Sequence, residues 1–224
     1  MSIHMRLNLV IIGPKRMTDL LPSIQYKISK SINAEDSYRD PQDWIVQIEA
    51  EIFVLSEDDQ ETYAGKCNFY FVDIETCCAL SDYDPSSLLD IESPTSFFID
   101  LFDETNYFSE EVEQVLQTEP HLRNLFIIDR VEIIHKFRGK GLSELAILDA
   151  INLHGMQAQV VALKSYPLQM EASYPRLEPS VHNKLMALDT FTCSNEDATH
   201  KLGLFYEKLG FKFIGNEGIM IKSR

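Results

Sequence analysis

The chain has few cysteines and no long apolar run, and each absence excludes a class of protein. Four cysteines among 224 residues are too few for the disulfide framework of a small secreted protein. Cys77 and Cys78 are adjacent and so are unsuited to pairing with each other. No apolar stretch approaches the ~20 residues that cross a bilayer, and the N-terminal segment has no clear signal-peptide cleavage site. We therefore expect a cytoplasmic protein that does not bind membranes.

Metal-ligand patterns are also lacking. The six histidines are scattered, and neither Cys67 nor Cys193 has a histidine at the spacing of a zinc site or of a thiol nucleophile. We interpret the cysteines as buried or unreactive thiols, and His135 as a solvated or capping residue. The sequence therefore predicts no metal cofactor.

Positive charge is scarce in the first half of the chain. Residues 35–122 hold 23 acidic residues and two basic ones, so this span has a charge of −21. The rest of the chain has a charge of +6, and the two together give the net charge of −15. Such a field repels nucleic acid and anionic membranes, and it attracts cations such as an amine substrate or a basic protein. A solvated surface that keeps the protein soluble accounts for the same charge, so both interpretations stay open.

The most informative stretch, residues 125–154, is typical of a strand, a basic glycine loop and a helix. Its first part, LFIIDRVEII, resembles a largely buried strand. From Leu142 apolar residues recur at helical spacing, and Gly155 can end the helix. The loop between them, Arg138-Gly139-Lys140-Gly141-Leu142-Ser143, brings two glycines and two cations to a helix N-terminus, which favours a bound phosphate. An ordinary turn with solvated basic residues would contain the same glycines.

Weaker patterns organise the first half. Residues 7–12 predict a strand, and residues 17–32 predict one or two helical turns around Pro22. Residues 44–55 and 63–74 alternate in polarity, which indicates a β-hairpin or two neighbouring strands.

Two irregular segments interrupt the second part of the chain. Residues 77–121 form an acidic, aromatic-bearing insert with a helix expected near residues 109–118. Residues 166–195 carry three prolines and form a second irregular segment. The acidic insert would cover the acceptor side of a site or bind a partner, and substrate specificity would reside in both segments.

The end of the chain predicts a helix and a hairpin. Apolar residues from Ala198 to Leu209 follow helical spacing, and Gly210 can cap the helix. Residues 211–215 and 219–222 then alternate like two strands around a turn.

Two motifs, in order along the chain, resemble the GNAT superfamily of N-acetyltransferases. The loop at 138–143 is similar to the Q/R-x-x-G-x-G/A signature, with Ser143 where that pattern has Gly or Ala. Leu204-Phe205-Tyr206-Glu207-Lys208-Leu209-Gly210-Phe211 is similar to the FYEKLGF segment that closes a helix near the cofactor in that family. The resemblance, which covers residues 125–163 and 197–224, implies one α/β domain over residues 1–224. Its mixed, largely antiparallel central sheet would be flanked by helices, with the acidic insert before the cofactor strand.

The resemblance also implies acetyl-CoA as co-substrate. Its pyrophosphate would be held by the backbone N–H groups of residues 139–143, namely Gly139, Lys140, Gly141, Leu142 and Ser143. Arg138 and Lys140 would add positive charge. The strand around Val131 and Ile133 would offer main-chain hydrogen bonds to the pantetheine arm, and one N–H there would polarise the thioester carbonyl.

The same resemblance implies catalytic roles. Tyr206 falls where the family often has a general acid that protonates the departing thiolate; the alternative is a packing residue with a satisfied hydroxyl. An amine with a pKa near ~10 arrives protonated, so a base is needed. Asp129 and Glu132 are separated by three positions, which predicts opposite faces of the strand. We prefer Glu132 as the base because it is nearer the thioester position, against the alternative of a carboxylate paired with Arg130 or solvent.

Two functions of different class remain. The first is an acetyl-CoA-dependent N-acetyltransferase that moves an acetyl group by direct attack of an amine, either a small molecule or a protein. It would have no nucleic-acid partner, and a homodimer is the assembly considered. The second is a GNAT-like module with little or no activity that binds acyl-CoA or a protein through its acidic insert. Ser143 and the long inserts keep the second open, whereas Tyr206 and the intact loop favour the first.

Overall fold

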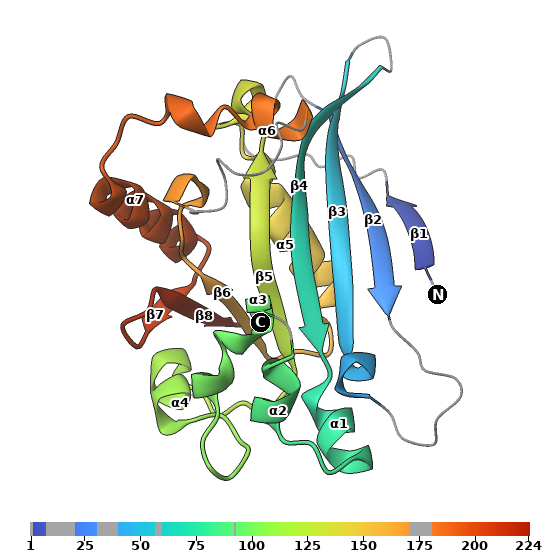
Figure 1. Cartoon of the computed structure of the whole chain (residues 1–224), viewed down its shortest axis with the longest axis vertical. Helices are drawn as coiled ribbons and strands as arrows, with labels where there is room; N and C mark the ends of the chain where they lie inside the picture. The colour runs from blue at the N-terminus through green and yellow to red at the C-terminus, as the bar shows by residue number, and fades with distance from the viewer. Residues whose placement is uncertain (1, 8–20, 31–39, 57–59, 92, 171–180) are drawn as a thin grey trace.

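The computed structural model describes residues 2–7, 21–30, 40–56, 60–91, 93–170 and 181–224. These residues form one eight-stranded sheet with the order β1-β2-β3-β4-β5-β6-β8-β7 (Figure 1). Neighbouring strands are antiparallel except β5 and β6, which are parallel. The strands are β1 (Ser2–Leu7), β2 (Leu21–Lys30), β3 (Ile45–Leu55), β4 (Glu61–Val72), β5 (Leu125–Ile133), β6 (Val160–Lys164), β7 (Lys212–Ile214) and β8 (Ile219–Ser223). The expected α/β class with a largely antiparallel sheet is confirmed.

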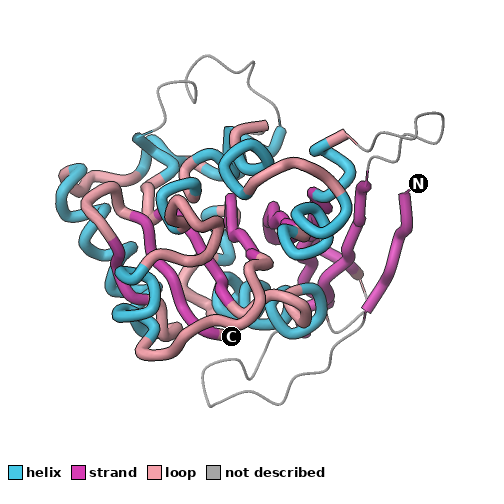
Figure 2. The backbone as a smooth tube through the Cα atoms, turned by 90° about the horizontal axis from the view of Figure 1, so that it is seen from below, coloured by secondary structure: helices cyan, strands magenta, loops and turns pink. Residues whose placement is uncertain are grey.

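Helices lie on both sides of the sheet (Figure 2). In Figure 1 the long helix α5 lies behind the strands, α3 lies in front of them, and α1 and α2 lie beyond the lower ends of β4 and β5. The helices are α1 (Ile74–Leu80), α2 (Pro85–Leu89), α3 (Ser93–Ser96), α4 (Glu110–Leu116), α5 (Leu142–His154), α6 (Val181–Met186) and α7 (Asn195–Lys208).

Each face of the sheet carries its own hydrophobic core. On β5, Phe126 and Ile128 join the cluster under α5, while Leu125 and Ile127 join the cluster under the insert. This alternation follows from the period of two along a strand. Buried on both faces, β5 can be an almost continuous apolar run, and this explains why the sequence identifies it clearly.

Most of the elements expected from periodicity are present. Residues 44–55 and 63–74 correspond to β3 and β4, which pair antiparallel, and the C-terminal helix and hairpin correspond to α7, β7 and β8. The predicted helix after the glycine loop is α5. The four cysteines are free, as expected.

The helical turns predicted at residues 17–32 are wrong over residues 21–30, which form β2, while residues 17–20 and 31–32 lie outside the described residues. Ile24 and Tyr26 are buried two positions apart and Ile28 packs against the same core, so the period here is that of a strand. Pro22 is tolerated because it lies near the start of the strand, before the pairing of β2 with β1 begins at Ile24. The strand expected at residues 7–12 lies, apart from Leu7 in β1, outside the described residues.

The acidic insert is folded against the sheet. Its predicted helix is α4, which begins after Ser109. Its apolar side chains are buried under the front face of the sheet: Leu88, Leu89, Phe98, Leu101, Phe108 and Val112. Residues 77–121 contain eleven acidic residues and no lysine or arginine. The insert therefore supplies core with its apolar residues and negative surface with its acidic ones.

Polar contacts fix the insert at both ends. Arg123, just before β5, donates from Nε to Glu75 Oε1 (2.9 Å) and from Nη2 to Glu75 Oε2 (3.1 Å), a bidentate pair that joins the start of α1 to the strand. On the far side, Lys212 Nζ donates to the Val115 carbonyl (2.8 Å) and holds α4 against β7. The position of the insert relative to the sheet is thus set by side-chain hydrogen bonds as well as by packing of the hydrophobic core.

Candidate functional site

The sheet divides where its two parallel strands diverge. β5 pairs with β6 only over residues 125–128, yet β5 continues to Ile133. At the point of divergence the pairing of β5 with β4 shifts register, because Ile128 faces Phe69 and Arg130 faces Asn68, so Asp129 is an extra, bulged residue. The far half of β5 therefore presents an edge that no described strand covers.

That edge lines a groove of about 600 Å³, closed on the other side by α7 and by residues 186–193. An adjoining hollow of about 300 Å³ shares much of its lining and extends the groove to the start of α5. The two hollows have seven lining residues in common: Val131, Ile133, Arg138, Gly139, Ser143, Leu202 and Phe205. Most of the residues expected to bind the cofactor thus lie around one groove.

Two main-chain N–H groups of β5 point into this groove. Ile134 N donates to the Ala64 carbonyl on β4 (2.9 Å). Successive residues of a strand direct their main-chain groups to opposite edges, so the N–H groups of Val131 and Ile133 point away from β4. These are the two residues that the resemblance assigns to the pantetheine arm.

The glycine loop ends the groove at the N-terminus of α5. Gly139 and Gly141 have φ of 71° and 81°, a left-handed backbone that glycine adopts without strain. Within the described part of the chain, the N–H groups of residues 139–143 have no hydrogen-bond partner. Unpartnered N–H groups at the start of a 13-residue helix form a favourable anion site.

The two basic residues of the loop behave differently. Arg138 donates from Nε to the Ile133 carbonyl (3.0 Å), donates from Nη2 to the Met186 carbonyl, and lies over the Phe191 ring. It therefore braces one wall of the groove against the other. Lys140 is exposed and is not among the residues that line the groove, so it can add charge to the loop only from its rim.

Tyr206 lies on α7 and lines the groove next to the glycine loop. The helix is fixed at its start by Ser194 Oγ, which accepts the Asp197 N–H (3.1 Å), and Tyr206 contacts the rings of Phe205 and Phe211. Burial, with a smaller effect of Cys67, raises the pKa of the Tyr206 hydroxyl well above its usual value. The hydroxyl therefore stays protonated near neutral pH and cannot act as a base.

Glu132 is buried in a polar cluster and lines none of these hollows. Its Oε1 accepts from Arg130 Nη1 (3.1 Å), and its Oε2 lies 2.5 Å from His182 Nε2 and 3.5 Å from Lys66 Nζ. Burial by itself raises the pKa of Glu132, but the hydrogen bonds of His182 and Arg130 and the charge of Lys66 outweigh burial and lower the pKa to about 2. Such a carboxylate remains ionised at neutral pH, so it favours a proton on His182 Nε2 and is a poor proton acceptor itself.

His182 and Tyr63 complete this cluster and were not found by sequence reasoning. The Tyr63 hydroxyl lies 3.1 Å from His182 Nδ1, so the chain Tyr63–His182–Glu132 joins β4, α6 and β5. In the neutral tautomer that carries its proton on Nε2, Nε2 donates to Glu132 and Nδ1 accepts a hydrogen bond from the tyrosine hydroxyl. The only signal in the sequence was a lone histidine within the second irregular segment.

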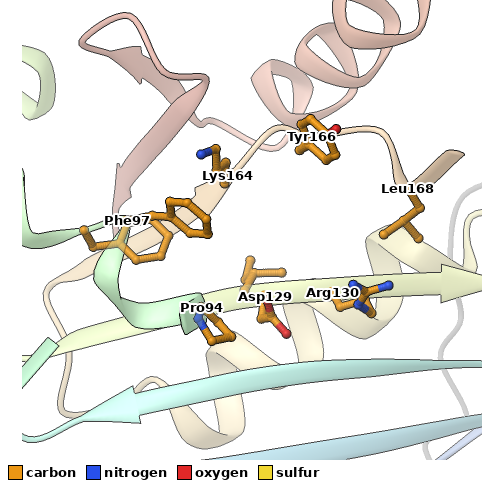
Figure 3. Close-up of a pocket in the computed structure, with 9 residues that line it drawn as sticks. Pro94, Phe97, Asp129, Arg130, Lys164, Tyr166 and Leu168 are labelled. Atoms are coloured by element: carbon orange, nitrogen blue, oxygen red, sulfur yellow. The ribbon is translucent and has the colours of Figure 1, made fainter. Parts of the chain in front are cut away.

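The bulge also alters which residues of β5 face the same way. Unbroken alternation predicts opposite faces for Asp129 and Glu132, but the extra residue breaks the alternation between them. Asp129 and its neighbour Arg130 both line a separate cavity on the insert side, shown in Figure 3. The alternation on which the expected opposite orientation of Asp129 and Glu132 was based is therefore interrupted, and only Asp129 of the two lines a described cavity.

No protein-family model, curated protein or solved structure matches this chain. Within the described residues there is no group of three or more histidine, cysteine or carboxylate side chains that could hold a metal ion. The same residues include no helix that is both long enough and apolar enough to span a bilayer. Function therefore has to be inferred from the groove and from the residues around it.

Proposed function

We propose that the chain is an acetyl-CoA-dependent N-acetyltransferase of the GNAT type, with an amine as acceptor. The observation that carries the proposal is the convergence of three kinds of hydrogen-bond donor on one groove. These are the N–H groups of the glycine loop, which bond to no described acceptor, the inward N–H groups of Val131 and Ile133, and the side chain of Tyr206, which lines the groove beside the loop. The divergence of β5 from β6 after Ile128 leaves the edge of β5 uncovered, so that its main-chain groups can bind a ligand in the groove.

The groove suits acetyl-CoA along its length. The N–H groups of residues 139–143 would hold the pyrophosphate, aided by the dipole of α5 and by Lys140 at the rim. Val131 and Ile133 would hydrogen-bond the extended arm as a neighbouring strand does. Arg138 would act through the wall that it braces, since its guanidinium is bonded to the carbonyls of Ile133 and Met186.

When bound, acetyl-CoA supplies an acetyl thioester to the amine. The nitrogen forms a bond to the acetyl carbon as the carbon–sulfur bond breaks, and Tyr206 gives its hydroxyl proton to the departing sulfur. We assign the proton lost by the amine to His182 Nδ1, which lies beside the Tyr63 hydroxyl. Because neither residue lines the described hollows, solvent carries the proton from the amine to this pair. Glu132 keeps the proton on His182 Nε2 and stabilises the imidazolium. Solvent then returns both groups to their starting state.

This scheme moves Glu132 from the role of base to that of a positioning residue. A carboxylate whose pKa is about 2 is a weak proton acceptor at neutral pH. The alternative considered from the sequence, a carboxylate paired with Arg130, is present in the structure and coexists with the His182 contact.

The test is calorimetric titration with acetyl-CoA of the wild-type chain and of two glycine variants. Gly141→Asp places a negative charge in the phosphate cradle and should weaken binding at least tenfold. Gly210→Asp is the matched control, because Gly210 also has a positive φ (88°) and has open space where a side chain would be added. It should bind like the wild type. Failure of the wild type to bind acetyl-CoA would overturn the proposal and favour an interaction module.

A further inference from the structure

A cavity of about 300 Å³ lies on the insert side of the diverging strands. One wall is the bulge of β5 with Asp129 and Arg130, and the opposite wall is the end of β6 and the chain after it (Figure 3). Leu168 lines both this cavity and the groove on the other side. Because Val131, whose N–H faces the groove, follows Arg130 directly, the cavity and the groove meet at the same stretch of β5.

The charged groups of the cavity have both signs. Asp129 supplies a carboxylate, and Arg130 and Lys164 supply two cations. Lys164 Nζ lies 3.7 Å from the centre of the Phe97 ring, and none of the described carboxylates pairs with it. Arg130, which also lines the cavity, donates from Nη1 to Glu132 Oε1 (3.1 Å). The cavity thus offers a carboxylate to an ammonium group and cations to an anion.

The remaining wall of the cavity is apolar. The insert contributes Pro94, Phe97 and Phe98, and none of the acidic residues of the insert that the structure describes lines the cavity. A volume of about 300 Å³ is at the lower end of the range for small-molecule sites. A polyamine or a basic peptide would need several carboxylates here, and the described lining provides one, Asp129.

We infer that this cavity is the acceptor site and that the acceptor is a free amino acid with an apolar side chain. The inference rests on the proposed transferase function and names its substrate class. Asp129 binds the amino group, Lys164 and Arg130 bind the carboxylate, and the side chain lies against Phe97 and Leu168. After it loses a proton, the amino nitrogen reaches the thioester past Leu168, which lines both the cavity and the groove.

The experiment is calorimetric titration, without acetyl-CoA, of three matched compounds: L-phenylalanine, phenethylamine, which lacks the carboxylate, and 3-phenylpropanoate, which lacks the amine. L-leucine, 3-methylbutylamine and 4-methylpentanoate form a second series, because the apolar wall accepts either kind of side chain. In at least one series the amino acid should bind at least tenfold more tightly than either fragment.

Two variants locate the binding. Lys164→Met removes the charge but keeps the length of the side chain, and it should lower amino-acid affinity about tenfold while leaving the amine unaffected. Lys27→Met, on the exposed pair with Glu49 on β2 and β3, is the control and should bind like the wild type. Asp129→Asn should weaken the amino acid and the amine but not the carboxylate.

The outcomes separate this inference from the function on which it rests. If acetyl-CoA binds and simple amines bind as tightly as amino acids, the transferase stands and the amino-acid assignment is overturned. If the amino acid binds with the expected dependence on Lys164 but acetyl-CoA does not bind, the cavity assignment stands as an amino-acid site and the transferase is overturned. If the folded wild type binds neither series, the assignment of the cavity is overturned.

Discussion

His182 Nε2 lies 2.5 Å from Glu132 Oε2, so a ring on α6 meets a buried carboxylate fifty positions earlier on β5. The carboxylate fixes the ring, and the other ring nitrogen faces the Tyr63 hydroxyl. A proton path therefore depends on a segment of the chain that carries no recognisable motif.

His182→Gln tests this path. Glutamine can still form hydrogen bonds but does not take up a proton near neutral pH, so kcat should fall by about 10²–10⁴-fold while acetyl-CoA affinity is unchanged. Initial rates with a saturating amine acceptor measure the effect. His200→Gln, an exposed change on α7, should leave the rate unaltered, and an unaltered rate for His182→Gln as well would remove the histidine from the mechanism.

Tyr206→Phe removes the proposed acid. We expect kcat to fall by about 10²-fold with no loss of acetyl-CoA affinity, because phenylalanine keeps the ring contacts with Phe205 and Phe211. Since burial raises the pKa of Tyr206, this hydroxyl should cause no decline in wild-type rate up to pH 10. Tyr107→Phe, a change at an exposed tyrosine of the insert, serves as control. Equal turnover of Tyr206→Phe and wild type would show that Tyr206 only packs.

Glu132→Gln should alter stability in a pH-dependent way. The folded-state pKa of about 2 lies below the ordinary 4.5, so the stabilisation is present above pH 4.5 and is lost as pH falls toward 2. At pH 7 the variant should be less stable by up to about 3 kcal/mol, and the difference should shrink between pH 5 and 2. Urea unfolding at several pH values measures this. Glu49→Gln, on an exposed pair, should cost less than about 1 kcal/mol, and a difference for Glu132→Gln that does not vary with pH would contradict the assignment.

Leu88→Ala and Leu80→Ala test whether the insert is part of the core. Leu88 is 0% exposed and Leu80 is 66% exposed. Loss of the buried side chain should cost about 2–5 kcal/mol, and loss of the exposed one should cost less than about 0.5 kcal/mol. Thermal and urea unfolding give both values. Similar small costs at the two positions would mean that the insert folds independently of the sheet.

Local sequence patterns predicted the helices and strands whose formation depends mainly on residues close to them in the sequence. β5 is a run of apolar residues because both of its faces are buried. α5 begins at Leu142, directly after Gly141, whose left-handed backbone the preceding loop requires. Residues 21–30 were misjudged because Pro22 suggested a break, whereas the pairing partners Val46 to Leu55 decide that the segment is a strand.

The parts of the site that sequence did not predict depend on contacts across the fold. The bulge at Asp129 follows from the register of β5 on β4, which no local pattern of β5 encodes. The contact between His182 and Glu132 forms only when the second irregular segment lies over the end of β5. A histidine without a motif gives no indication of such a partner.

Phe98 is 1% exposed within the front core and is also a wall of the cavity at the bulge. Trimming it to admit a larger ligand would remove part of the packing that holds the insert to the sheet. The neighbouring Phe97 is 41% exposed and carries little of that packing. Changes of ligand preference in natural or laboratory evolution should therefore occur at Phe97 and Leu168. Phe98 should be retained, because its replacement would destabilise the fold.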